Sequence, residues 1–242
     1  MNGIAYDELG TRLRLYKGIS GNAAAAKDSL KILVLHGFGS TAEACKRQVR
    51  PLFDSLDTVC ELHFIDGMHE APQLLAMMFG SSSGNAWWSM HPSSQGKGYS
   101  DSVRQLIDVL ELEPKCKHSK PFDGILGFSQ GAAMVAMLVA EQAIRNKSWF
   151  KFACCISGFI PSIYEMKNTI DAMGHKAYVH RVVPSWHSFG ANDIVIQKER
   201  SFALAQKMNN STICDCHAGG HEINVSDPRV LQSFGSFVAG QR

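Results

Sequence analysis

Short runs of β-forming residues alternate with longer helical stretches along most of the chain, and this alternation constrains the fold more than any other feature. Two of the runs, K-I-L-V-L at 31–35 and F-A-C-C-I at 152–156, are almost continuously apolar. That pattern is typical of strands buried on both faces of a sheet. Strands that are separated by helices build βαβ units. The sequence therefore predicts an α/β fold, with an open, mostly parallel sheet and helices on both faces.

The expected elements follow from periodicity and from capping residues. Strands are predicted at 12–15, 31–35, 61–65, 122–126, 152–156, 181–189 and 211–216, and helices at 41–56, 100–112, 130–144 and 197–208. A last helix should begin at Ser226-Asp227-Pro228, where an N-cap residue precedes a proline.

The domain organisation is expected to be simple. Residues 31–242 should form one domain, and residues 1–30 an N-terminal extension with a possible peripheral strand followed by a linker at 18–29. The segment 67–99, rich in Gly, Ser, Met and Trp, fits no regular element and predicts a short, irregular, lid-like insert.

Composition argues against several functional classes. With 242 residues, 45% hydrophobic residues and a net charge of +2, the chain has no electrostatic preference for nucleic acid. The longest apolar run, 132–140, is far shorter than the roughly 18 residues of a membrane-spanning helix. The N-terminus lacks the pattern of a secretory signal, so we expect a cytoplasmic protein, with a mitochondrial address as the lesser alternative. An odd number of cysteines, seven, favours reduced thiols.

Ser129 is the candidate nucleophile. The pentapeptide G-F-S-Q-G at 127–131 matches G-x-S-x-G, and a predicted strand leads into it while a predicted helix follows. This is the context of a nucleophile elbow, in which flanking glycines make room for a strained serine. A second match, G-S-S-S-G at 80–84, centres on Ser82 but lacks the preceding strand, which favours an ordinary loop serine.

Acyl transfer also needs hydrogen-bond donors where negative charge develops. In this architecture one donor is the backbone N–H after the nucleophile, here Gln130, and the other comes from the loop after an early strand. That loop contains H-G-F-G at 36–39, so we expect the N–H of Phe38 to be the second donor. His36 lies upstream of the nucleophile, which favours a structural role.

The acid and the base should follow the nucleophile in that order along the chain. Asp193 follows the strand predicted at 181–189, at the carboxyl edge of the sheet, and is preferred over Asp215, which lies inside a predicted strand. His221 is preferred over His217 as the base, because two glycines before His221 allow it to reach back to the serine.

Two cysteines and two histidines within eight residues raise the alternative of a zinc site. Cys214 and Cys216 lack the C-x-x-C and H-x3–5-H pairing of structural zinc sites. We therefore expect neither a metal nor a cofactor.

Several motifs together resemble the FSH family of serine hydrolases. The likeness covers about residues 31–238 and is carried by L-H-G-F, W-W, P-F-D-G-I-L-G-F-S-Q-G-A-A, I-S-G-F, F-G-A-N-D-I-V and H-A-G-G-H. G-F-S-Q-G is also similar to the acyl-protein thioesterase and carboxylesterase branch, but W-W and S-G-F favour FSH. The resemblance implies an α/β-hydrolase fold, esterase activity and a Ser129–Asp193–His221 triad. Two departures are Asn85-Ala86, where the family often has a basic residue, and Ala218, where it often has proline.

The expected function is hydrolysis of small-molecule carboxylic esters with medium or long acyl chains. Apolar residues of the insert, namely Met77, Met78, Phe79, Trp87, Trp88 and Met90, could line an acyl site. Among these, Trp87 and Trp88, together with Phe159 of I-S-G-F, are the candidate substrate-binding residues. The alternatives are an acyl-protein or acyl-CoA thioesterase and a non-catalytic ligand-binding protein of the same fold.

Overall fold

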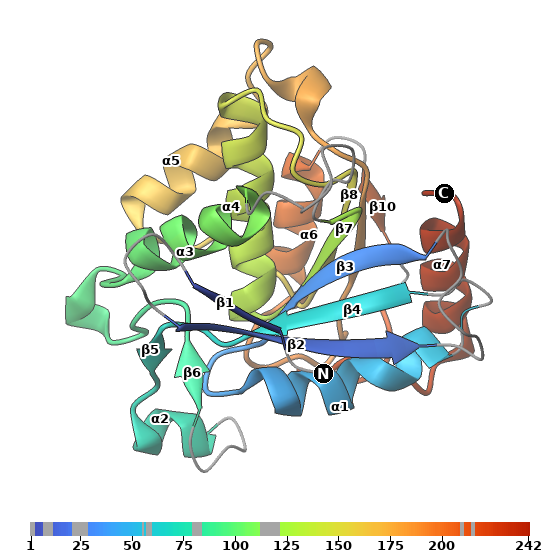
Figure 1. Ribbon diagram of the computed structural model, residues 1–242, viewed down its shortest axis with the longest axis horizontal. Coiled ribbons are helices and arrows are strands. Elements are labelled where there is room, and N and C mark those ends of the chain that lie inside the picture. Colours follow the sequence, from blue (N-terminus) through green and yellow to red (C-terminus); the bar gives the residue numbers. More distant parts are fainter. Residues whose placement is uncertain are drawn as a thin grey trace.

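The structure is a computed structural model, which describes residues 3–6, 12–20, 29–54, 56, 60–78, 84–111, 122–208, 211–213 and 216–242. An eight-stranded sheet in the order β1-β2-β4-β3-β7-β8-β9-β10 crosses it (Figure 1). The strands are β1 Gly3–Tyr6, β2 Arg12–Ser20, β3 Leu30–Leu35, β4 Cys60–Ile65, β7 Gly124–Phe128, β8 Phe152–Ile156, β9 Ser185–Ser188 and β10 Ser211–Ile213. From β4 to β10 all neighbours pair in parallel, so the prediction of a mostly parallel sheet is confirmed.

The strands predicted at 122–126 and 181–189 differ from the observed strands in position or length, and β10 contains only residues 211–213 of the predicted 211–216, of which 214 and 215 lie outside the described residues. β7 starts two residues later than expected because the carboxylate of Asp123 accepts a hydrogen bond from the N–H of Lys31 and pairs with Lys151. β9 contains only four residues of the predicted 181–189, since Val179–Arg181 forms a 3-10 turn and Pro184 precedes the strand.

The N-terminal strands extend the sheet at one edge. β2 pairs antiparallel with β4 through residues 16–20, and β1 pairs antiparallel with β2. The predicted linker is therefore wrong for Gly18, Ile19 and Ser20, which belong to β2. The domain boundary at residue 30 stays a prediction.

Helices cover both faces of the sheet (Figure 1). One core cluster contains residues of α3 Tyr99–Glu111, α4 Gln130–Ile144, α5 Tyr164–Ala172 and α6 Lys198–Lys207. The other cluster contains residues of α1 Ala42–Asp54 and α7 Pro228–Ala239. Five of these helices lie at predicted positions, and the side chain of Asp227 caps α7 by accepting from the N–H of Arg229. Helix α5 was not predicted.

Helix α4 forms the centre of the first core cluster. Nearly all of its residues are buried, from Gln130 to Ala143, and it packs against β7, β8, α3 and α5. A helix without a polar face is stable in water only when it is enclosed in this way.

The segment 67–99 is more regular than predicted. It contains β5 His69–Glu70 paired antiparallel with β6 Asn85–Ala86, the short helix α2 Gln73–Met78 and a 3-10 turn at Pro92–Ser94. A small cluster of Phe38, Ala71, Ala76 and Ala86 packs it against the loop after β3. The expectation of an irregular segment is thus wrong for these elements, and a lid role stays a prediction. In the part of the chain that the structure describes, no helix has the length and hydrophobicity of a bilayer span.

Candidate active site

Ser129 lies at the sharp turn between β7 and α4. Its φ of 53° and ψ of −117° fall in a region that L-residues rarely adopt, and its N–H donates to the carbonyl of Ile156, 2.8 Å away. Such strain persists only where the surroundings enforce it, and it is common at functional sites.

The two glycines of the motif allow the turn to form. A Cβ on Gly127 would lie 2.4 Å from the carbonyl carbon and oxygen of Gly131. A Cβ on Gly131 would lie 2.4 Å from the carbonyl oxygen of Leu35 and 2.6 Å from that of His36. Helix α4 therefore begins in direct contact with the end of β3, and both glycine positions exclude any side chain.

Gly131→Ala is expected to lower the free energy of unfolding by about 2–3 kcal/mol, because the added methyl group forces backbone atoms apart. Gly235→Ala, also within a helix, is the matched control, since its Cβ would lie 3.4 Å from Leu56 in ordinary contact. Alanine there should raise stability by up to about 1 kcal/mol. Urea unfolding measures both, and equal effects of the two variants would contradict this account.

Ser129, His221 and Asp193 form one chain of hydrogen bonds. Ser129 Oγ lies 2.9 Å from His221 Nε2, and His221 Nδ1 lies 2.7 Å from Asp193 Oδ2. Asp193 Oδ1 accepts from the N–H groups of Val195 and Ile196, at 2.9 and 2.7 Å. Since the carboxylate can only accept, the imidazole carries its proton on Nδ1, and Nε2 is free to accept the proton of Ser129.

The three hydrogen-bonded side chains come from three different loops at the carboxyl edge of the sheet. Ser129 follows β7, Asp193 follows β9, and His221 precedes α7. Asp193 and Ser129 are 5% and 8% exposed, and the ring of Phe128 lies 4.9 Å from that of His221. The arrangement can move a proton from a hydroxyl group to an imidazole and stabilise the imidazolium that results.

The alternative residues have other surroundings. His36 is fully buried; its Nε2 accepts from the N–H of Gly67 at 2.9 Å, and burial lowers the pKa of its ring. His217 Nδ1 accepts from the N–H of Gly219 at 3.1 Å, and burial lowers its pKa as well. These contacts fit the structural role that is predicted for His36, and they fit the choice of His221 over His217 as the base. Asp215 lies outside the described residues.

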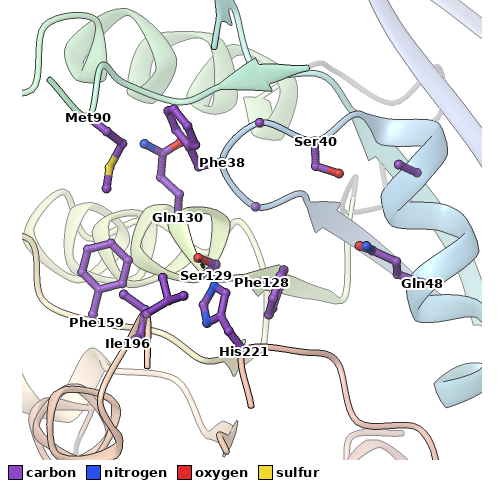
Figure 2. A pocket seen from close by; sticks show the side chains of 14 residues that line it. Phe38, Ser40, Gln48, Met90, Phe128, Ser129, Gln130, Phe159, Ile196 and His221 are labelled. Atoms are coloured by element: carbon purple, nitrogen blue, oxygen red, sulfur yellow. Dashed lines mark hydrogen bonds between the residues drawn. The ribbon is translucent and has the colours of Figure 1, made fainter. Parts of the chain in front are cut away.

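A cavity of about 390 Å³ opens at Ser129 (Figure 2). On one side of it lie the apolar side chains of Met90, Phe159 and Ile196, whereas Ser40 and Gln48 lie on the other side. A second cavity of about 740 Å³ adjoins the first. The two share the side chains Met90, Phe159, Val195 and Ile196 as a common wall.

The expected oxyanion donors lie beside Ser129. Gln130 is the first residue of α4, so its N–H has no acceptor inside the helix, and Phe38 lines the same cavity from the loop after β3. In addition, the side chain of Gln130 is buried and forms hydrogen bonds with the backbone of Trp87 and Trp88, which no sequence pattern predicted.

The substrate-binding predictions are only partly matched by the geometry. Phe159 lines both cavities, and Trp88 lines only the second, with its ring 6.4 Å from that of Phe159. Trp87 is fully buried, and it is not one of the described residues that line these two cavities. Its placement as a substrate contact is therefore corrected: the indole N–H is used within the protein, where it bonds the carbonyl of His36.

The other apolar candidates of the insert divide in the same way. Met90 lines both cavities, but Met77 is 60% exposed and lines neither of them. The side chain of Met78 and all of Phe79 lie outside the described residues. Val195 and Ile196 were missed, although their position two and three residues after Asp193 could have indicated them.

A metal site has no support in the described part of the chain, where no group of three or more His, Cys, Asp or Glu side chains could hold an ion. Cys216 is a free thiol, and Cys214 lies outside the described residues. His221 instead belongs to the hydrogen-bond chain with Ser129.

Comparisons with known proteins agree with this fold. The zebrafish (Danio rerio) protein named esterase OVCA2 is 30% identical over 227 residues, which cover 85% of this chain and 96% of the relative. Among solved structures, esterase PE8 matches with a TM-score of 0.67 at 18% identity, covering 94% of this chain and 99% of its own. Zea mays acyl-protein thioesterase 2 matches with a TM-score of 0.63 at 18% identity, covering 93% of this chain and 98% of its own.

The two structural matches establish the α/β-hydrolase fold, as the sequence resemblance implied. Residues 26–231 match the model of the serine hydrolase family FSH1, which covers most of the chain. The protein belongs to the FSH1 family of serine hydrolases.

Proposed function

We propose that this serine hydrolase cleaves carboxylic esters through an acyl-enzyme formed on Ser129. The observation that carries the proposal is the unbroken hydrogen-bond chain Ser129–His221–Asp193 at a cavity with one apolar side. The zebrafish relative is named an esterase, which supports the ester as the bond that is cleaved.

The first half of the reaction forms the acyl-enzyme. His221 Nε2 takes the proton of the Ser129 hydroxyl as Oγ attacks the ester carbonyl carbon, and Asp193 stabilises the imidazolium. The N–H groups of Gln130 and Phe38 donate to the oxyanion of the tetrahedral intermediate. When the intermediate collapses, the alcohol leaves with the proton from His221. In the second half, His221 deprotonates a water molecule that attacks the acyl carbon of the acyl-enzyme. The bond to Ser129 Oγ then breaks, the acid leaves, and His221 returns the proton to Oγ.

The cavity walls suggest how an ester lies in the site. Met90, Phe159 and Ile196 offer apolar contact on one side of Ser129, where we place the acyl chain (Figure 2). Ser40 and Gln48 lie on the opposite side, where we place the alcohol. The adjoining cavity behind the shared wall extends the acyl side, which favours medium or long chains.

The test is hydrolysis of p-nitrophenyl esters of increasing acyl length, with matched thioesters, in the presence of a chelator. We expect chelator-resistant turnover with a maximum at a medium or long chain, and a preference for the ester of each matched pair. Preferential turnover of the thioesters would support the thioesterase alternative instead. No turnover together with no labelling of Ser129 by a fluorophosphonate would support a non-catalytic binding protein.

Phe159→Ala is expected to lower kcat/KM about 10-fold for the preferred acyl chain and to move the maximum to longer chains. Phe159 is 5% exposed in the shared wall, and the lost contact with the chain is worth about 1.5–3 kcal/mol at most. Phe202→Ala is the control, because Phe202 is 45% exposed on α6 and lines neither of the two cavities. An unchanged chain-length profile in Phe159→Ala would remove Phe159 from the acyl site.

A further inference from the structure

Trp87 joins the two loops that flank Ser129. Its indole Nε1–H donates to the carbonyl oxygen of His36, 2.8 Å away, and its backbone N–H donates to Oε1 of Gln130, 2.9 Å away. His36 is two residues before Phe38, and Gln130 directly follows the nucleophile. One buried residue therefore connects the segments that carry both proposed oxyanion donors.

The side chain of Gln130 completes this connection. Its Nε2–H donates to the carbonyl oxygen of Trp88 at 2.9 Å, and the residue is 1% exposed. A backbone N–H can only donate and a carbonyl oxygen can only accept, so the two contacts fix the orientation of the amide. The carbonyl of Trp87 in turn accepts from Ser102 Oγ of α3 at 2.6 Å, which anchors the connection to the core.

The loop that carries Phe38 is held on both sides of that residue. Gly37 and Gly39 flank Phe38, and after it the N–H of Gly39, whose φ is 70°, donates to the carbonyl of Asn85 at 2.9 Å. The indole of Trp87 holds this loop at its first residue, His36, whose ring also lies 5.1 Å from that of Trp87.

We infer that Trp87 and the side chain of Gln130 are positioning residues that set the separation of the Gln130 and Phe38 N–H groups. The inference rests on the proposed function of those groups as oxyanion donors. Donors act when they lie about 2.7–3.1 Å from the developing oxyanion, and a displacement of about 1 Å can lower the rate about 100-fold. The effect belongs to the transition state, so it should fall on kcat and not on KM.

Trp87→Phe tests the inference, because it removes the indole donor and keeps an aromatic ring and all backbone bonds. We expect kcat to fall about 10-fold to 100-fold at every acyl chain length, with KM changed less than about 2-fold. The affinity for a trifluoromethyl ketone, which forms an oxyanion on the serine, should fall in parallel.

Trp186→Phe is the matched control for stability. Trp186 is also fully buried, and its Nε1–H donates to Ser233 Oγ at 3.0 Å, but it packs in the other core cluster with Phe234. Both variants should lower the melting temperature, whereas only Trp87→Phe should lower kcat and inhibitor affinity. Equal kinetic effects of the two would reduce Trp87 to a structural residue and overturn the inference. A loss confined to KM, or to some chain lengths, would make Trp87 a substrate contact and overturn it as well.

Gln130→Glu gives an independent test that does not depend on the folding of Trp87→Phe. The introduced carboxyl group, when protonated, can accept from the Trp87 N–H and donate to the Trp88 carbonyl; when ionised it has no proton to donate. Burial raises the pKa of a carboxyl group, so protonation of the introduced Glu side chain shifts toward the pH range in which ester hydrolysis is measured. The kcat of the variant divided by that of the wild type should therefore rise as pH falls. A ratio that stays low at every pH would contradict the positioning role.

Ser129→Ala in the same assays distinguishes the proposed function from the proposed positioning role of Trp87 and Gln130. Activity that survives in Ser129→Ala would overturn the proposed function itself. Activity lost in Ser129→Ala but unchanged in both Trp87→Phe and Gln130→Glu would overturn only the positioning role.

Discussion

Ser129→Ala should reduce kcat by roughly five to six orders of magnitude, to the level that binding and the oxyanion donors alone support. The substitution removes only Oγ, which lies 2.9 Å from His221 Nε2, and leaves the glycines that accommodate the turn. The variant should therefore fold and still bind ester. Hydrolysis of the preferred p-nitrophenyl ester measures the loss, and circular dichroism checks the fold.

The control for Ser129→Ala is already present in the sequence. Ser82 is the central residue of the other G-x-S-x-G match, so Ser82→Ala changes the same residue type in the same motif. We expect wild-type kcat and wild-type fluorophosphonate labelling for Ser82→Ala. More than about 1% of wild-type kcat in Ser129→Ala would exclude Ser129 as the nucleophile, since a triad serine contributes far more than 100-fold.

Asp193→Asn should lower kcat about 10⁴-fold while the fold is retained. Oδ1 of Asp193 accepts from the N–H groups of Val195 and Ile196, so the amide oxygen of the new side chain must take that place. Its NH₂ group then faces His221 Nδ1, where Oδ2 lay at 2.7 Å. The imidazole must accept at Nδ1 and carry its proton on Nε2, and it can no longer take the proton of Ser129.

Asp227→Asn is the control for Asp193→Asn. Asp227 caps α7, and asparagine serves equally well as an N-cap, so kcat and stability should stay close to those of the wild type. The NMR signal of the ring N–H protons of His221 reports the tautomer directly. An Asp193→Asn variant that keeps the proton on Nδ1, or that keeps more than a tenth of wild-type kcat, would contradict this role of Asp193.

The sequence was informative wherever backbone geometry restricts the residue type. Gly127 and Gly131 predicted the turn at Ser129 because any side chain would meet backbone atoms there. The order of the candidate acid and base along the chain, and the glycines before His221, indicated the two residues that the structure joins to Ser129. The alternation of strands and helices also predicted the parallel sheet. A strand that is buried on both faces has a continuous hydrophobic sequence, and this pattern depends little on which strands lie beside it.

The sequence was uninformative where tertiary contacts decide. The pair Trp87-Trp88 does not by itself indicate which of the two rings faces a cavity. The ring of Trp87 lies in the interior, where its indole N–H donates to the carbonyl of His36. Helix α5 has only two buried residues, Met166 and Ile170, so its periodicity is weak. The length of β2 depends on its pairing with β4, and the local sequence of β2 does not indicate that this distant partner is present.

The residues around Ser129 are buried in the core, whereas part of the cavity wall lies at the surface, and this difference decides which residues of the site can change during evolution. Ser129 precedes α4 and Gln130 begins it, and nearly all residues of this helix are buried, so substitutions beneath the two residues disturb the packing of the core cluster. Part of the wall of the proposed acyl site comes from partly exposed surface segments, such as Met90 at 41% exposure and Val195 at 37%. The wall of the proposed site can therefore change one residue at a time, while the buried residues around Ser129 stay the same.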